Sequence, residues 1–277
     1  MKLKLLPTII AAAGFVAAPF AVAATYQSEI STAYADIDVN DDSEEGYFFG
    51  IEGKYYFAPV DTTNYPLAEA AFIEKASNVY IGLGNFEFKE AGDRLDIYQR
   101  SIGVDFYIPN TVFYVGAGVN EIKSKYTWPA EGNFAGGNDS SKWDSAWFVK
   151  AGIAPITGLL VWTEFTEDID VSDQWNINGK YVLPLSGEQA LNLEASYAKS
   201  DISYAEDTIT GAVDYYLDRH LSIGAGFENT SYSSDEDSTT DYFVRARNFF
   251  TDNISAELTY TDGDYESSLM LGGTIRF

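Results

Sequence analysis

The feature that most restricts the fold of this sequence is an alternation of apolar and polar residues with a period of two, which recurs along almost the whole chain. In residues 265–277, one set of alternate positions includes Leu269, Leu271 and Ile275, whereas the other set is mostly polar or small. The same pattern recurs in residues 191–197, 221–228 and 254–260. A period of two indicates β-strands with one apolar and one polar face. The chain is therefore expected to be all-β.

The first 24 residues form a separate segment. Lys2 and Lys4 precede a mostly apolar run and a small-residue cleavage motif at residues 21–23, which is the arrangement of a secretory signal peptide. We expect residues 1–24 to be removed, which leaves residues 25–277 and changes the formal charge from −25 to −27. No later stretch has the ~20 uncharged apolar residues of a transmembrane helix. If the mature chain spans a membrane, it must do so as a closed barrel.

Composition excludes several classes of function. With 17 Lys and Arg against 42 Asp and Glu, the chain lacks the basic surface that binds nucleic acid. The absence of Cys excludes thiolate metal sites, and the single histidine, His220, excludes sites built on paired imidazoles. We expect no catalytic residues, no metal site and no cofactor. The 20 Tyr and 18 Phe are the aromatic excess that collects at bilayer interfaces.

Two kinds of turn alternate along the chain and predict the number of strands. Short breaks lie near residues 109–110, 155–158, 184–187, 218–220 and 251–253. Longer or more acidic breaks lie near residues 39–45, 128–142, 168–173, 200–203 and 233–238, with a tight turn at 262–263. Short periplasmic turns that alternate with outer loops are typical of outer-membrane barrels. We predict a transmembrane antiparallel meander β-barrel of about fourteen strands, within a range of roughly twelve to sixteen.

Two segments are candidates for narrowing a pore. Within residues 58–77, Pro66 stands where a helix would begin and good helix formers follow it up to Lys75. We expect one or two helical turns near residues 66–75 on the periplasmic side, either as a cap on the barrel mouth or as a plug in the lumen. The loop of residues 128–142 is the other candidate, and display at the cell surface is equally compatible with its sequence.

The run from Tyr55 to Phe72 reads YYFAPVDTTNYPLAEAAF and resembles the hallmark segment of the family of putative general bacterial porins. The match is specific around residues 55–78 and architectural elsewhere. The resemblance implies a channel of about fourteen strands in the outer membrane, which passes water and small solutes and is monomeric or weakly associated, with a monomer favoured over a trimer. Implied partners are outer-membrane lipid and lipopolysaccharide, small polar solutes and ions, and the barrel-assembly machinery through the C-terminal Phe277.

The polar residues at alternate positions along each strand are expected to line the pore. Opposed acidic and basic walls orient polar solutes, and rings of charge set ion preference. The same charges can instead pair as salt bridges that only keep the lumen solvated. Arg100 occupies an alternate position that belongs to the apolar face with Ile102 and Val104, which predicts a bulge or a change of register nearby. The predicted pore-lining residues are Glu52, Lys54, Lys150, Lys180, Glu194, Asp214, Glu228, Asp241, Arg245, Arg247, Glu257 and Arg276, with Glu29, Asp105 and Glu164 on the same parity.

These features together predict a non-enzymatic outer-membrane porin, a passive diffusion channel for water, ions and small polar solutes. The excess of acidic residues predicts a mild preference for cations. The alternative is a surface barrel with a closed lumen, such as an adhesin or a structural protein.

Overall fold

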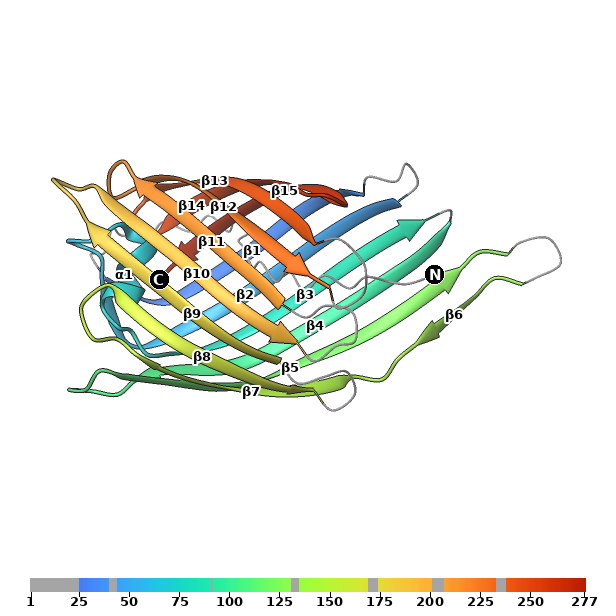
Figure 1. Ribbon diagram of the computed structural model, residues 1–277, viewed down its shortest axis with the longest axis horizontal. Coiled ribbons are helices and arrows are strands. Elements are labelled where there is room, and N and C mark those ends of the chain that lie inside the picture. The colour runs from blue at the N-terminus through green and yellow to red at the C-terminus, as the bar shows by residue number, and fades with distance from the viewer. Residues whose placement is uncertain are drawn as a thin grey trace.

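The computed structural model describes residues 25–39, 44–90, 92–130, 135–168, 174–200, 207–232 and 238–277. Fourteen antiparallel strands follow one another around a barrel, which closes because the last strand pairs with the first (Figure 1). One further short strand, β6, pairs only with the end of β5. The predicted meander barrel is confirmed. Within the described ranges, no helix has the length and apolar character needed to cross a membrane.

The strands all run between the same two ends of the barrel. Every strand except the short β6 is long enough to cross the apolar part of a bilayer, which needs about 9–11 tilted residues. Their bounds are β1 Thr25–Val39, β2 Glu44–Asp61, β3 Asn78–Glu90, β4 Asp93–Tyr107, β5 Phe113–Trp128, β6 Gly137–Ser140, β7 Asp144–Ile153, β8 Leu159–Asp168, β9 Gln174–Pro184, β10 Ala190–Ser200, β11 Asp207–Tyr216, β12 Leu221–Ser231, β13 Thr239–Thr251, β14 Ile254–Asp262 and β15 Glu266–Arg276.

The predicted short breaks all fall between strands at one end of the barrel, here called the short-turn end, where β1 begins and β15 stops. Asp218 fixes one of these turns, because its carboxylate accepts hydrogen bonds from the backbone N–H groups of His220 at 2.7 Å and Leu221 at 2.9 Å. Those bonds hold the pKa of Asp218 below its usual range. His220 thus belongs to a turn.

The opposite end carries the predicted longer breaks, of which residues 40–43, 131–134, 169–173, 201–206 and 233–237 lie outside the described residues. One turn at this end was missing from the sequence-based assignment. Strand β3 stops at Glu90 and β4 starts at Asp93, with Gly92 at a φ of +96°, which glycine adopts without strain. Only two residues separate these strands, so the sequence offers little loop by which the turn could be recognised.

The two faces of the wall have the predicted polarity. Leu271 is 59% exposed on the outer surface, whereas its neighbour Met270 is 5% exposed and packs inside the barrel against Ala33, Ala35 and Phe48. Large apolar side chains are exposed in the same way on the outer face of the other long strands. An apolar outer belt of this kind is suited to lipid. Met270 differs from the expectation in one respect, because its surroundings in the lumen are apolar.

Aromatic pairs near the short turns divide between the two faces. Tyr55 and Phe57 are exposed on the outside, whereas Tyr56, between them, is buried inside. Likewise, Phe250 faces outward and Phe249 is buried. The outward members lie where an interfacial girdle is expected. Of the inward members, Tyr56 packs against a segment inside the barrel.

That segment consists of residues 62–77 and is called here the plug segment. It contains a 3₁₀ turn, Leu67–Glu69, followed by one α-helical turn, α1, at Ala70–Ile73. Figure 1 shows α1 within the ribbon at the short-turn end of the barrel. Leu67 and Ala70 are completely buried, and burial of a leucine side chain contributes roughly 2 kcal/mol. The segment therefore packs as part of the interior.

The described part of the loop at residues 128–142 extends the wall instead of entering the lumen. Residues Gly137–Ser140 pair with Lys125–Trp128, which continues the edge of β5 as a hairpin. Figure 1 shows this hairpin projecting beyond the ends of the neighbouring strands. The structure thus favours the plug segment over this loop as the element that narrows the lumen.

Candidate functional site in the barrel lumen

The plug segment is held to widely separated parts of the barrel by one backbone–backbone hydrogen bond and two bonds from basic side chains to backbone carbonyls. Lys75 Nζ donates to the carbonyl oxygen of Ala154, after β7, at 2.7 Å. The N–H of Leu67 donates to the carbonyl of Arg219, between β11 and β12, at 2.8 Å, and the carbonyl of Leu67 accepts from Arg276 Nη1 on β15 at 2.7 Å. These contacts span most of the circumference, so the segment lies across the lumen.

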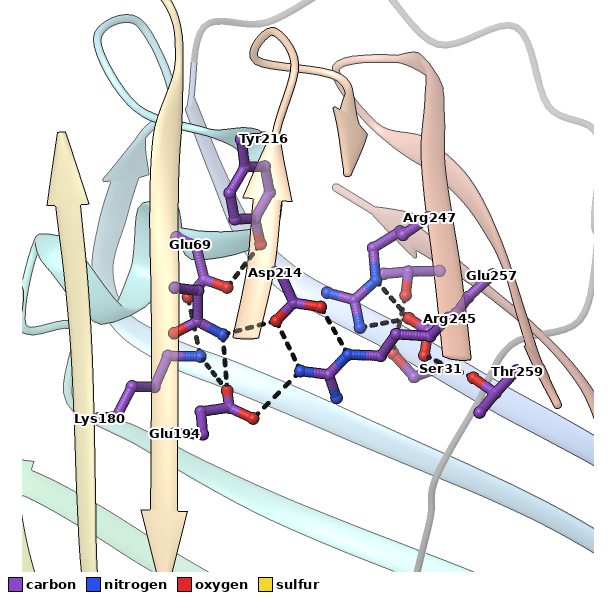
Figure 2. Close-up of polar contacts among 12 residues, drawn as sticks. Ser31, Glu69, Lys180, Glu194, Asp214, Tyr216, Arg245, Arg247, Glu257 and Thr259 are labelled. Atoms are coloured by element: carbon purple, nitrogen blue, oxygen red, sulfur yellow. Dashed lines mark hydrogen bonds and ion pairs between the residues drawn. The ribbon is translucent and has the colours of Figure 1, made fainter. Parts of the chain in front are cut away.

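One acidic residue of the plug segment reaches the far wall. The carboxylate of Glu69 is 3% exposed, accepts a hydrogen bond from the hydroxyl of Tyr216 on β11 at 2.6 Å and lies 2.9 Å from Lys180 Nζ on β9 (Figure 2). Lys180 lies at the same distance, 2.9 Å, from Glu194 on β10. A lysine that bridges two carboxylates joins the plug segment to the wall by charge as well as by packing.

An arginine continues this chain of charges. Arg245 on β13 donates to both oxygens of Asp214, each at 2.6 Å, and its Nη2 also lies 3.2 Å from Glu194 (Figure 2). Asn192 donates to Glu194 at 2.8 Å and to Asp214 at 2.9 Å, which fixes the two acids relative to each other. Glu69, Lys180, Glu194, Asp214 and Arg245 are called here the lumen network. Four strands and the plug segment contribute to it, and three carboxylates face two bases.

All six predicted basic residues lie inside the barrel, and every one pairs with an acid. Pairing of this kind largely cancels the field that separate acidic and basic walls would create. Besides the lumen network, the pairs are Lys54 with Glu52 at 3.2 Å, Lys150 with Asp105 at 3.2 Å and Glu164 at 3.8 Å, Arg276 with Glu29 at 2.6 Å, and Arg247 with Glu257.

The remaining two predicted acids lie in the other half of the lumen. Glu228 on β12 and Asp241 on β13 face each other across the ladder, and Thr210 donates a hydrogen bond to Glu228 at 3.2 Å. Among the described residues, neither acid has a basic group within ion-pair distance. The predicted set therefore separates into a paired group near the plug segment and unpaired acids toward the long-loop end.

A polar cavity of about 100 Å³ adjoins the plug segment and the lumen network. It is lined by Ala68, Glu69, Lys180, Asn192, Glu194, Asp214, Tyr216, Ser222, Arg245, Arg247 and Glu257. Six of these were predicted from strand parity. The predicted set does not contain Glu69, which lies in a segment without strand periodicity, nor Asn192 and Tyr216, because that set consists only of charged strand residues.

Arg100 is the one basic residue whose predicted surroundings were wrong. The ladders from β3 to β4 and from β4 to β5 run through Arg100 without a register shift, so no bulge turns it inward. It faces outward beside Glu121, with Nε 2.5 Å from the carboxylate, and its guanidinium lies 4.1 Å from the ring centre of Trp143.

A family model described as "Putative general bacterial porin" matches residues 1–277. The chain belongs to this porin family. No curated protein sequence matches it. As a member of the family, the porin is an outer-membrane channel. Outer-membrane barrels have short periplasmic turns and longer outer loops, so we expect the short-turn end to face the periplasm.

Solved structures show the same fold at low sequence identity. The Acinetobacter baumannii outer membrane protein Omp33 is similar with a TM-score of 0.66 and 20% identity over 92% of the porin and 99% of that chain. The Ralstonia pickettii toluene transporter TbuX has a TM-score of 0.62 and 6% identity, with 91% and 90% covered. The monoaromatic hydrocarbon channel CymD has a TM-score of 0.61 and 9% identity, with 91% and 89% covered.

Proposed function

We propose that the porin passes ions and small polar solutes by passive diffusion, and that the plug segment sets the upper limit of their size at the periplasmic end. The observation that carries this proposal is the attachment of the plug segment across the lumen, through Glu69 to Lys180 and through Leu67 to Arg276. A segment tied to opposite walls leaves only the space beside it for transport. No enzymatic step is proposed, since the family and the fold are those of a channel.

The chemistry beside the plug segment favours hydrated solutes. Apart from Ala68, the residues that line the cavity there all have polar or charged side chains. The Oδ1 atom of Asn192 is buried and has no hydrogen-bond partner among the described residues, so it is available to accept a hydrogen bond from water or from a solute. An apolar solute would have to displace water from these groups without replacing the hydrogen bonds, which is costly.

Single-channel conductance in planar bilayers tests this proposal. Replacing residues 66–73 by a Gly-Ser linker of equal length removes the packed helical turns while keeping the strands connected, and conductance should rise several-fold. The milder variant Glu69→Gln keeps the packing of the segment but weakens its attachment to Lys180, and it should raise the frequency of conductance steps. Lys199→Gln, on the outer face of β10 and away from the lumen, is the matched control and should behave as the wild type. Unchanged conductance in the linker variant would refute a constriction by this segment.

We also propose a mild preference for cations that arises at the extracellular half of the lumen. Glu228 and Asp241 are unpaired there among the described residues, whereas the bases near the plug segment are bound by acids. Unpaired carboxylates concentrate cations within about a Debye length, ~10 Å at 0.1 M salt. The extracellular half of the lumen, which holds these unpaired acids, therefore determines that cations are preferred over anions.

Reversal potentials in a potassium chloride gradient test this part of the proposal. Glu228→Gln combined with Asp241→Asn should lower the ratio of cation to anion permeability. Glu188→Gln, in the turn between β9 and β10 at the periplasmic end, removes one acid from outside the strands and should change the ratio less. An anion-selective wild type would contradict the proposal.

Three further assignments rest on the sequence and its resemblance. We propose that residues 1–24 are cleaved, that the chain acts as a monomer, and that the barrel-assembly machinery recognises Phe277. N-terminal sequencing of the mature protein, cross-linking in the membrane and insertion kinetics of Phe277→Ala test them one by one. Retained leader residues, trimers or unchanged insertion would each refute the corresponding assignment.

A further inference from the structure

The outer face of β3, β4 and β5 carries an unusual concentration of bases near the extracellular end. Along these ladders, the outward positions from the level of Leu83 toward the loops hold five basic residues against three acidic ones, in a chain with 17 bases and 42 acids. The bases, called here the outer basic face, are Lys89, Arg94, Arg100, Lys123 and Lys125.

The ladder fixes the height of the outer basic face in the membrane. Arg100 pairs with Leu83 on one side and with Glu121 on the other. One outward step toward the periplasm lie Ile102, which is 54% exposed, and Val119. The basic face therefore begins where the apolar belt ends.

An aromatic residue marks the same boundary. Trp147 pairs with Val119, is exposed on the outer surface and lies one outward step below Ser145, which faces Glu121. Tryptophan on the outer surface of a barrel is enriched at the level of the lipid headgroups. The bases directly above Trp147 are thus placed beside the headgroups of the outer leaflet.

The acids in this region neutralise only part of the basic face. Glu87 lies 2.6 Å from Lys89 and 2.7 Å from Arg94, and Arg94 also pairs with Asp96 at 2.7 Å. In these pairs Lys89 and Arg94 keep 46% and 43% of their side chains accessible, whereas Glu87 and Asp96 keep only 18% and 2%.

Lys123 and Lys125 differ from the other three bases. They stand on β5 at consecutive outward positions opposite Tyr98 and Asp96. Asp96 is only 1% exposed and is bound by Arg94. Among the described residues, neither lysine has a carboxylate within ion-pair distance, so two positive charges remain available to a ligand from the membrane.

We propose that the outer basic face binds the phosphate groups of an outer-leaflet glycolipid of the lipopolysaccharide class, with Lys123 and Lys125 as the principal contacts and Arg100 at the membrane edge. The ligand is a phosphorylated lipid because the charges adjoin an apolar belt that receives acyl chains. Lysine and arginine supply the donors that phosphate oxygens accept. The site lies outside the lumen and does not depend on the proposed route of transport.

Lipid binding by the mature porin in detergent micelles tests the proposal. Titration with diphosphoryl lipid A, followed by native mass spectrometry, gives the Kd for wild type and for Lys123→Gln/Lys125→Gln. Each lysine near an anionic lipid surface contributes about fivefold, so the double variant should bind on the order of 25-fold more weakly. Lys123→Arg/Lys125→Arg should retain binding, since the charges remain.

Controls separate this site from general attraction to the barrel. Lys199 lies on the outer face of β10, paired with Trp175 at the same end of the barrel, and Lys199→Gln should leave the Kd unchanged. Dephosphorylated lipid A should bind much more weakly than the diphosphoryl form, and inorganic phosphate in millimolar excess should not displace the lipid. Equal Kd values for wild type and Lys123→Gln/Lys125→Gln, equal weakening by Lys199→Gln, or displacement by inorganic phosphate alone would overturn the proposal. Channel conductance of each variant verifies that the barrel is intact.

Discussion

The lumen network and the outer basic face contain similar residue types, but the wall of the barrel gives them different surroundings. Inside, Arg245 is enclosed by Asp214 and Glu194, and Asp214 keeps only 6% of its side chain accessible. Outside, the paired bases Lys89, Arg94 and Arg100 keep 43–46% of their side chains accessible, and Lys123 and Lys125 have no acidic partner among the described residues. Charges that satisfy one another hold protein segments together, whereas charges left unmatched are free to bind a ligand.

The largest difference between the two regions should appear in stability. Arg245→Ala leaves Asp214 and Glu194 without their arginine in a partly dehydrated site, so the free energy of unfolding should fall by about 3–5 kcal/mol. Lys123→Gln should change it by less than about 0.5 kcal/mol. Urea titration in lipid vesicles measures both values. Similar losses in the two variants would remove the distinction between a structural and a ligand-binding set of charges.

A smaller effect tests the height assigned to the outer basic face. Val104 faces outward on β4, two outward steps toward the periplasm from Arg100. Val104→Arg should cost about 2–4 kcal/mol, as for a charge near the bilayer midplane, and Tyr98→Arg only about 0–1 kcal/mol, because it lies on the headgroup side. The same urea titration applies. If both arginines cost the same, the outer basic face does not lie at the membrane boundary.

The smallest expected effect is a gain of lipid affinity. Glu121 accepts hydrogen bonds from Arg100 and, at 3.0 Å, from Ser145. Glu121→Gln removes an exposed ion pair, so stability should change by no more than about 1 kcal/mol. One more uncompensated positive charge should tighten binding of diphosphoryl lipid A by up to about fivefold. Weaker binding in this variant would show that Glu121 positions Arg100 for the lipid.

The architecture of the wall could be predicted from the sequence because each strand repeats a local rule. Alternation assigned Leu271 to the outside and Met270 to the inside without any knowledge of their neighbours. The same rule identified six bases on the inner face of the strands, although not Lys75 of the plug segment. It failed to indicate the apolar surroundings of Met270, which depend on side chains from β1 and β2 that only the closed barrel brings together.

The arrangement of the charges could not be predicted in the same way. Parity places Lys180 on the inner face but does not indicate that Glu69, more than a hundred residues earlier, will approach it. Arg100 shows the converse error, since a charge on the apolar parity was interpreted as a register fault. Alternation assigned Arg100 correctly to the outer face, but it does not indicate how deep in the bilayer this residue lies.

The position of Arg276 has a consequence for the order in which the barrel assembles. This residue, next to the last in the chain, binds Glu29 on the first strand and the carbonyl oxygen of Leu67 in the plug segment. Contacts so distant in sequence form late, because the intervening chain must first be ordered. Because the side chain of Arg276 makes both contacts, joining of the first and last strands and final docking of the plug segment share one late step. The channel therefore acquires its constriction at the moment when its wall becomes continuous.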